Sequence, residues 1–94
     1  MAAWVYMLKC ADGSYYVGCT TNIDQRFGQH LAGEIPGYTQ TRLPVEMIWS
    51  DEFQTVDDAI VVERQIKGWS RAKKEALARG DWVAVQRLAS RAAK

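Results

Sequence analysis

The chain has 94 residues, 48% of them hydrophobic and 24% charged, and its formal net charge is +1 at pH 7. A chain of this length forms one domain with one modest core. It has no run near the roughly 18 apolar residues that a membrane span needs, and residues 1–6 lack the basic start of a signal peptide. We therefore expect residues 1–94 to form a single cytoplasmic domain that does not enter a membrane.

The small net charge hides a strong asymmetry along the chain. Residues 1–58 contain three basic against eight acidic side chains, a balance of −5. Residues 59–94 contain nine basic against three acidic side chains, a balance of +6. A basic C-terminal part is typical of a protein that binds a polyanion, although the same charges would also suit a solvated helical face.

The first predicted element is a β-hairpin. Residues 4–9 and 15–19 are rich in aromatic and aliphatic side chains, as strands are. The dipeptide Asp12-Gly13 between them is a strong hairpin signal, because glycine adopts the positive φ that tight turns require.

The length of the hairpin loop decides where two tyrosines point. A two-residue loop would place Tyr6 and Tyr16 on opposite faces of the sheet, because strand side chains alternate. A three-residue loop ending at Gly13 instead pairs Tyr6 with Gly18. Leu8 then faces Tyr16, and both phenols lie on one face. We predict the three-residue loop, since a shared site needs both rings on one side.

A helix is predicted after the hairpin, with Asn22 as its N-cap and Gly33 at its end. Gln25 stands three residues after the cap, as in a capping box. The residues that should face the core recur with the helical period: Ile23, Phe27 and Leu31. Arg26 and His30 are four residues apart, so they project from one flank of this helix.

The rest of the chain is predicted to form a polar loop, a third strand and three helices. The loop spans residues 34–44, the strand spans residues 45–49, and residues 50–54 connect the strand to the next helix. The N-caps of the three helices are Thr55, Ser70 and Asp81, and the first two helices end at Gly68 and Gly80. The last helix should run to Arg91 and bury an apolar stripe of Trp82, Val85, Leu88 and Ala89.

The order of these elements, ββαβααα, predicts an α+β domain in which helices flank a small three-stranded sheet. The order alone leaves both an antiparallel and a mixed sheet open.

Several residues suit the hydrolysis of a phosphodiester bond, which needs an activated water and an electrophile for the developing charge. Glu63 could hold a divalent ion, because one or two carboxylates commonly suffice for Mg²⁺. Arg26 offers a bidentate fork for a phosphate. His30 could bind a phosphate oxygen or move a proton, and a tyrosine whose pKa a cation lowers can act as a base.

Each of these residues also has a purely structural interpretation. Glu63 could pair with Lys67 four residues further on, and Arg26 could be an ordinary surface arginine. His30 could be a structural hydrogen-bonding residue, and the strand tyrosines could serve packing alone. Tyr38, in the polar loop, could stack on a base or anchor its own loop.

Read in order, Trp4-Val5-Tyr6, Tyr16-Val17-Gly18, Arg26 with His30, and Glu63 resemble the catalytic domain of the GIY-YIG endonuclease superfamily. The resemblance is strongest to its small single-domain bacterial members, which are similar to the N-terminal incision domain of the excinuclease C subunit. It includes the pair Tyr38-Thr39 and residues 63–74. The likeness covers a core of about residues 4–82 of the single domain, and a basic C-terminal helical extension spans residues 70–94.

The resemblance implies a three-stranded antiparallel sheet flanked by helices and a role for each motif residue. Tyr6 would be the base that activates water, with Tyr16 as its hydrogen-bond partner. Gly18 would leave space for the phosphate or for close strand approach. Arg26 would stabilise the transition state, His30 would assist at the phosphate, and Glu63 would hold a single Mg²⁺ or Mn²⁺.

The chain departs from the family pattern at two places. Trp4 stands where the first signature triplet opens with glycine, and no asparagine follows Asn22 in the sequence, although better-studied members place one after the glutamate. The lysines after Glu63 could contact the substrate instead: Lys67, Lys73 and Lys74.

Three functions are therefore open. The first is a metal-dependent DNA endonuclease, for which the family resemblance implies a role in DNA repair. The second is a nucleic-acid-binding module with weak or lost catalysis, whose basic C-terminal part supplies the affinity. The third is a protein-interaction adaptor that uses the exposed part of the C-terminal helix pair.

Overall fold

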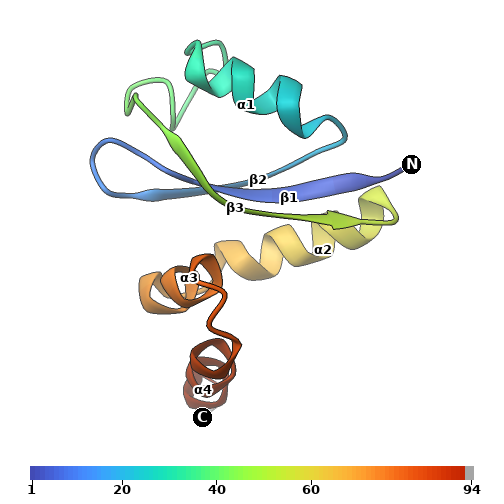
Figure 1. The fold of residues 1–94 in the computed structure, drawn as a ribbon, viewed down its shortest axis with the longest axis vertical. Coiled ribbons are helices and arrows are strands. Elements are labelled where there is room, and N and C mark those ends of the chain that lie inside the picture. The colour runs from blue at the N-terminus through green and yellow to red at the C-terminus, as the bar shows by residue number, and fades with distance from the viewer. Residues whose placement is uncertain (93–94) are drawn as a thin grey trace.

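The computed structural model describes the backbone of residues 1–92 and the side chains of residues 1–87, and its element order is the predicted ββαβααα (Figure 1). The elements are β1 (Ala3–Lys9), β2 (Tyr15–Thr20), α1 (Ile23–Leu31), β3 (Glu46–Phe53), α2 (Val56–Lys67), α3 (Arg71–Ala78) and α4 (Trp82–Ala92). Within residues 1–92, every helix is too short or too polar to cross a lipid bilayer.

The three strands form one antiparallel sheet in the order β2-β1-β3, so β1 is the central strand. Tyr6 pairs with Gly18 and Leu8 with Tyr16, which confirms the three-residue hairpin loop. The loop is closed by a hydrogen bond of 2.8 Å from the amide of Cys10 to the carbonyl of Ser14. Both signature tyrosines therefore lie on the same face of the sheet.

The third strand is longer than predicted. Residues 50–53, expected to be a connection, continue β3, and Ser50 pairs with Tyr6 and Glu52 with Trp4. These residues are polar because β3 is an edge strand with exposed side chains at Ser50, Asp51 and Glu52. They join the sheet through backbone hydrogen bonds, so their side chains show no hydrophobic pattern that would predict a strand.

Helices cover both faces of the sheet, with α1 on one side and α2 and α3 on the other (Figure 1). The side chains of β1 alternate between two cores. Ala3, Val5 and Met7 belong to a core that also includes residues of α2, α3 and α4, whereas Tyr6 and Leu8 belong to a core with residues of α1. Because both faces of β1 are covered, the strand is hydrophobic almost throughout instead of alternating.

All four predicted N-caps are confirmed. Each cap side chain accepts a hydrogen bond from a backbone amide three residues further on: Asn22, Thr55, Ser70 and Asp81. These bonds satisfy amides that the first turn of a helix leaves unpaired. Local side-chain chemistry therefore fixes where every helix of the described chain begins.

Two predictions of burial were wrong. Leu31 is 50% exposed, because the buried position on α1 is taken by its neighbour His30. Trp82 is 58% exposed at the start of α4, although Val85 of the same predicted stripe is buried. The side chains of Leu88 and Ala89 lie outside the described residues.

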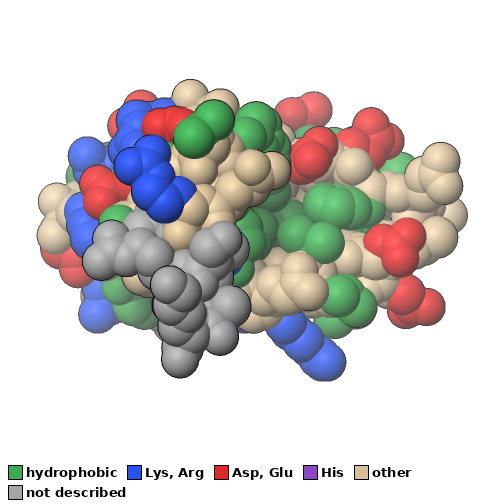
Figure 2. All heavy atoms as spheres, turned by 90° about the horizontal axis from the view of Figure 1, so that it is seen from below, with side chains coloured by type: hydrophobic (Ala, Val, Ile, Leu, Met, Phe, Trp, Pro, Cys, Tyr) green, Lys and Arg blue, Asp and Glu red, His purple; other side chains and the backbone are tan. Residues whose placement is uncertain are grey.

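The charge asymmetry of the sequence is visible on the surface. On the face seen from the α4 side, most basic side chains lie at one end, where acidic ones are mixed among them, whereas the charged side chains at the other end are acidic (Figure 2). The basic end lies toward α3, which agrees with the positive balance of the C-terminal part.

Gly13 and Gly28 form a matched pair for testing the hairpin. A Cβ at either position meets no atom within 4 Å, but Gly13 has a φ of +85° whereas Gly28 is helical. We expect Gly13→Ala to lower the free energy of unfolding by about 1–2 kcal/mol, because a side chain disfavours left-handed backbone. Gly28→Ala should raise it by about 0.5–1 kcal/mol. Urea unfolding of both variants checks this, and equal effects would contradict the loop geometry.

Candidate active site

The centre of the candidate site is a hydrogen bond between two fully buried side chains. The hydroxyl of Tyr6 lies 2.9 Å from Nε2 of His30, and both residues are 0% exposed. We expected Tyr16 to be the hydrogen-bond partner of Tyr6, and this was wrong. Tyr16 instead packs beside the pair, with its ring centroid 6.3 Å from that of Tyr6 and 5.3 Å from that of His30.

Gly18 makes room for the Tyr6 ring. The two residues face each other across β1 and β2, and a Cβ at Gly18 would collide with Cζ and the hydroxyl of Tyr6. The space beside this glycine, expected to receive a phosphate or a neighbouring strand, is therefore filled by an aromatic ring. The missing side chain lets the phenol lie close to β2 and reach His30.

The other nitrogen of His30 is also hydrogen bonded. Its Nδ1 lies 2.8 Å from Oγ1 of Thr39, and Thr39 is 2% exposed. Thr39 belongs to the polar loop between α1 and β3, and we had not included it among the site residues. The sequence signalled Thr39 only through the pair Tyr38-Thr39 of the family resemblance, which gave the threonine no role, and His30 lies nine positions away in the sequence.

The same loop is fastened to the hairpin by Arg42. Its guanidinium lies 3.0 Å from the carboxylate of Asp12, donates to the carbonyl of Tyr38 at 2.8 Å, and covers the Tyr38 ring at 3.9 Å. Tyr38 in turn stacks on Tyr16, with ring centroids 6.1 Å apart. Tyr38 therefore anchors its own loop, which was one of the two roles considered for it.

Both members of the central pair are held neutral. Burial, together with the nearby Tyr16, raises the pKa of Tyr6 to about 12, although the charge of Arg26 acts in the opposite direction. Burial, together with the charge of Arg26, lowers the pKa of His30 below its ordinary value. At pH 7 the site thus contains a phenol and an uncharged imidazole beside a permanent cation.

Arg26 and Glu63 approach the site from opposite faces of the sheet. Arg26 is half-buried on α1, and Glu63 is half-buried on α2. Burial raises the pKa of the Cys19 thiol on β2, Glu63 raises it further and Arg26 lowers it, so both charges lie near this one residue. Because β2 is an edge strand, the two charges lie on either side of this edge and not on one face.

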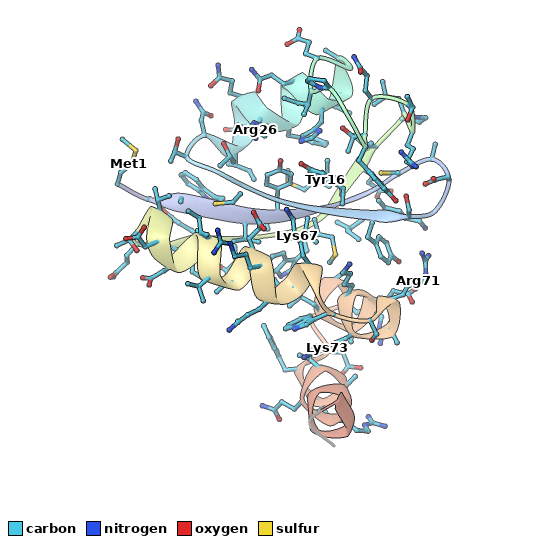
Figure 3. All side chains as sticks on the ribbon, turned by 180° about the vertical axis from the view of Figure 1, so that it is seen from behind. Met1, Tyr16, Arg26, Lys67, Arg71 and Lys73 are labelled. Carbon is cyan, nitrogen blue, oxygen red and sulfur yellow. The ribbon has the colours of Figure 1, made fainter. Side chains whose placement is uncertain are left out.

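Figure 3 shows the same division: Tyr16 and Arg26 lie between the sheet and α1, whereas Lys67 and Lys73 lie on the α2 and α3 side. Lys67 forms an ion pair of 3.2 Å with Glu63, which is the structural alternative considered for Glu63. The ammonium of Lys73 lies over the Trp69 ring at 3.9 Å, and Lys74 is half-buried on α3.

Glu63 is compatible with a hydrated divalent ion but supplies one carboxylate. Its side chain is 16% exposed, and the described residues contain no cluster of three or more His, Cys, Asp or Glu side chains that could hold a metal ion. Mg²⁺ often keeps several waters and takes one or two carboxylates together with substrate phosphate. A single ion on Glu63 would therefore depend on water and substrate for most of its ligands.

The chain matches known proteins over most of its length. The family model of the GIY-YIG catalytic domain matches residues 2–76. A UPF0213 protein of Natronomonas pharaonis is 46% identical over 74 residues, which cover 79% of this chain and 87% of that protein. A UPF0213 protein of Streptococcus pneumoniae is 40% identical over 73 residues, or 78% of this chain and 74% of that protein.

Two solution NMR structures share the fold. That of a UPF0213 protein from Bacillus halodurans has a TM-score of 0.56 at 38% identity and covers 84% of each chain. That of a protein from E. faecalis has a TM-score of 0.59 at 32% identity and covers 88% of each chain. The α+β architecture with its three-stranded antiparallel sheet is thus common to these proteins.

The packing of Tyr6 against Gly18 can be tested by one methyl group. Gly18→Ala should lower the free energy of unfolding by about 1–3 kcal/mol, because the added Cβ must displace a fully buried ring. Gly28→Ala, which adds the same methyl group in open space, is the matched control. A Gly18→Ala variant as stable as the native protein in urea would show that the ring does not lie against this glycine.

The lowered pKa of His30 predicts a loss of stability in mild acid. The unfolded state binds the proton more readily than the folded state, so stability falls as the pH drops below the unfolded pKa of about 6.5. The slope attributable to this group can reach about 1.4 kcal/mol per pH unit. Urea unfolding between about pH 7.5 and 5.5 measures it. The His30→Gln variant, which has no histidine, should lack this slope.

Proposed function

Because the chain belongs to the GIY-YIG catalytic domain family, we propose that it is a metal-dependent endonuclease that hydrolyses phosphodiester bonds in DNA. The observation that supports this most is the buried Tyr6–His30 hydrogen bond with Arg26 and Tyr16 beside it. A phenol hydrogen-bonded to a neutral imidazole, with a guanidinium nearby, can move a proton and stabilise negative charge.

Tyr6 alone is a poor base at pH 7, because its pKa is about 12 and its proton is held. His30 resolves this difficulty. As a water attacks the phosphorus, its proton passes to the oxygen of Tyr6 while the phenol proton passes to Nε2 of His30, 2.9 Å away. Tyr16 is half-buried and more exposed than Tyr6, so the water would approach along Tyr16.

Arg26 would stabilise the charge that develops on the phosphate oxygens. This role is supported by the position of Arg26 on α1 and by its effects on the pKa values of Tyr6 and Cys19. A guanidinium is suited to this task because it is always charged and donates two parallel hydrogen bonds.

Glu63 would hold one Mg²⁺ or Mn²⁺ near the β2 edge, where Arg26 also lies. Such an ion polarises a phosphate oxygen and stabilises the leaving oxygen. Lys67 neutralises part of the charge of Glu63. Lys67, Lys73 and Lys74 would contact the DNA backbone from α2 and α3, and such contacts give affinity without sequence preference.

A nucleic-acid-binding module with weak or lost catalysis is the alternative. It is favoured by the Glu63–Lys67 ion pair, which satisfies the carboxylate without a metal ion, and by the lack of any asparagine after Asn22. In that case the basic C-terminal part would bind nucleic acid and the Tyr6–His30 pair would serve packing.

The proposed function is tested by nicking of supercoiled plasmid in Mg²⁺ or Mn²⁺. Glu63→Gln and Arg26→Gln should each lower the nicking rate by roughly 10²–10³-fold, because each removes one charge that the transition state needs. Asp57→Asn is the matched control, since it neutralises an exposed carboxylate on the same helix.

Binding to a fluorescent DNA duplex at several salt concentrations accompanies the nicking assay. Binding that weakens with salt in all variants, without nicking by the native protein in either metal, would support the binding module instead.

A further inference from the structure

Three buried groups form a continuous hydrogen-bonded chain under α1. The hydroxyl of Tyr6 meets Nε2 of His30 at 2.9 Å, and Nδ1 of the same ring meets Oγ1 of Thr39 at 2.8 Å. Tyr6 and His30 are 0% exposed and Thr39 is 2% exposed. A polar chain this deeply buried must satisfy its members from within, so each hydrogen bond restricts the next.

A neutral imidazole has one donor and one acceptor nitrogen, so only two arrangements are possible. In the first, Nδ1–H donates to Thr39 and Nε2 accepts from Tyr6. In the second, Nε2–H donates to the phenol oxygen and the threonine hydroxyl donates to Nδ1. Phenols are far more acidic than aliphatic alcohols and are therefore the better donors. The aliphatic oxygen is the better acceptor, because a phenol shares its lone pair with the ring. Both bonds favour the first arrangement.

We propose that Thr39 is a positioning residue that holds His30 as the tautomer protonated at Nδ1, so that Nε2 is free to accept the proton of Tyr6. The hydrogen bond at one imidazole nitrogen decides which proton the other carries. The catalytic consequence rests on the proposed nuclease function, whereas the tautomer itself is a property of the fold.

The proton balance of the step requires this tautomer. When the phenol proton of Tyr6 moves to Nε2 of His30, a new N–H bond forms there and the Tyr6 oxygen takes the proton of the attacking water, so Tyr6 ends as a phenol and His30 as an imidazolium. Nδ1 keeps its own proton and its hydrogen bond to Thr39. In the other tautomer Nε2 is already protonated, and the phenol proton has no acceptor within the chain.

Thr39 is itself held in place by contacts to the hairpin loop. The amide of Arg42 donates to the carbonyl of Thr39 at 3.0 Å, and the guanidinium of Arg42 is paired with Asp12 at 3.0 Å. Asp12 accepts a further hydrogen bond from the amide of Ser14. The threonine hydroxyl thus reaches His30 from a loop that is braced against another part of the chain.

Nitrogen-15 NMR of the imidazole tests the proposal directly, because the chain has only one histidine. At a pH where the ring is neutral, native protein should show a protonated Nδ1 and an unprotonated Nε2. Thr39→Val, which keeps the shape and removes the acceptor, should lose most of this tautomer, and Thr39→Ser should keep it. A native ring protonated at Nε2, or a Thr39→Val ring unchanged from the native one, would overturn the proposal.

The kinetic arm uses the plasmid-nicking assay. Thr39→Val should lower the nicking rate by roughly 10–100-fold, a part of what a general base contributes, and Thr39→Ser should recover most of the loss. A Thr39→Ser variant as slow as Thr39→Val would count against the proposal.

The two proposals fail in different ways. If the native protein does not nick DNA but shows the Nδ1 tautomer and its loss in Thr39→Val, the proposed function is wrong and the positioning role of Thr39 stands. If Thr39→Val does not fold, the spectra of native protein and Thr39→Ser still decide which nitrogen is protonated.

Discussion

The packing of the Tyr6 ring over Gly18 is the contact on which the rest of the site depends. A side chain at Gly18 would push the ring away from the sheet, and its hydroxyl would then lose its contact with His30. The hairpin register creates this contact, because a shift of one residue would turn the two tyrosines to opposite faces. Gly18, in the second signature triplet, thus makes room for the ring of Tyr6, in the first triplet.

The central position of β1 explains why the site is divided. Its alternate side chains build two cores, so α1 with Arg26 and His30 must pack on one face and α2 with Glu63 on the other. Arg26 and Glu63 both affect the pKa of the Cys19 thiol, which places the two charges near the edge strand β2. A substrate that uses both Arg26 and Glu63 would therefore lie across this edge.

The sequence allowed prediction where local chemistry decides the structure. The hairpin register and the four N-caps follow from turn and capping residues, whereas the grouping of Tyr6, Tyr16 and His30 was what the family resemblance implied. The exceptions depend on distant partners. Ser50 and Glu52 pair with β1 by backbone alone, and Thr39 reaches His30 only because Arg42 fastens its loop to the hairpin. The pattern of hydrophobic side chains along the sequence does not predict such contacts.

The opposite pKa shifts of Tyr6 and His30 have one common consequence. Each shift favours the neutral form, so moving the proton from phenol to imidazole creates two charges in a buried site and is unfavourable in the free protein. The positive charge of Arg26 stabilises a phenolate at Tyr6 but destabilises an imidazolium at His30. On the proposed function, a bound phosphate would neutralise Arg26 and attract the imidazolium proton. The substrate would then supply the charge that makes His30 a stronger acceptor, and the free protein would keep the pair uncharged.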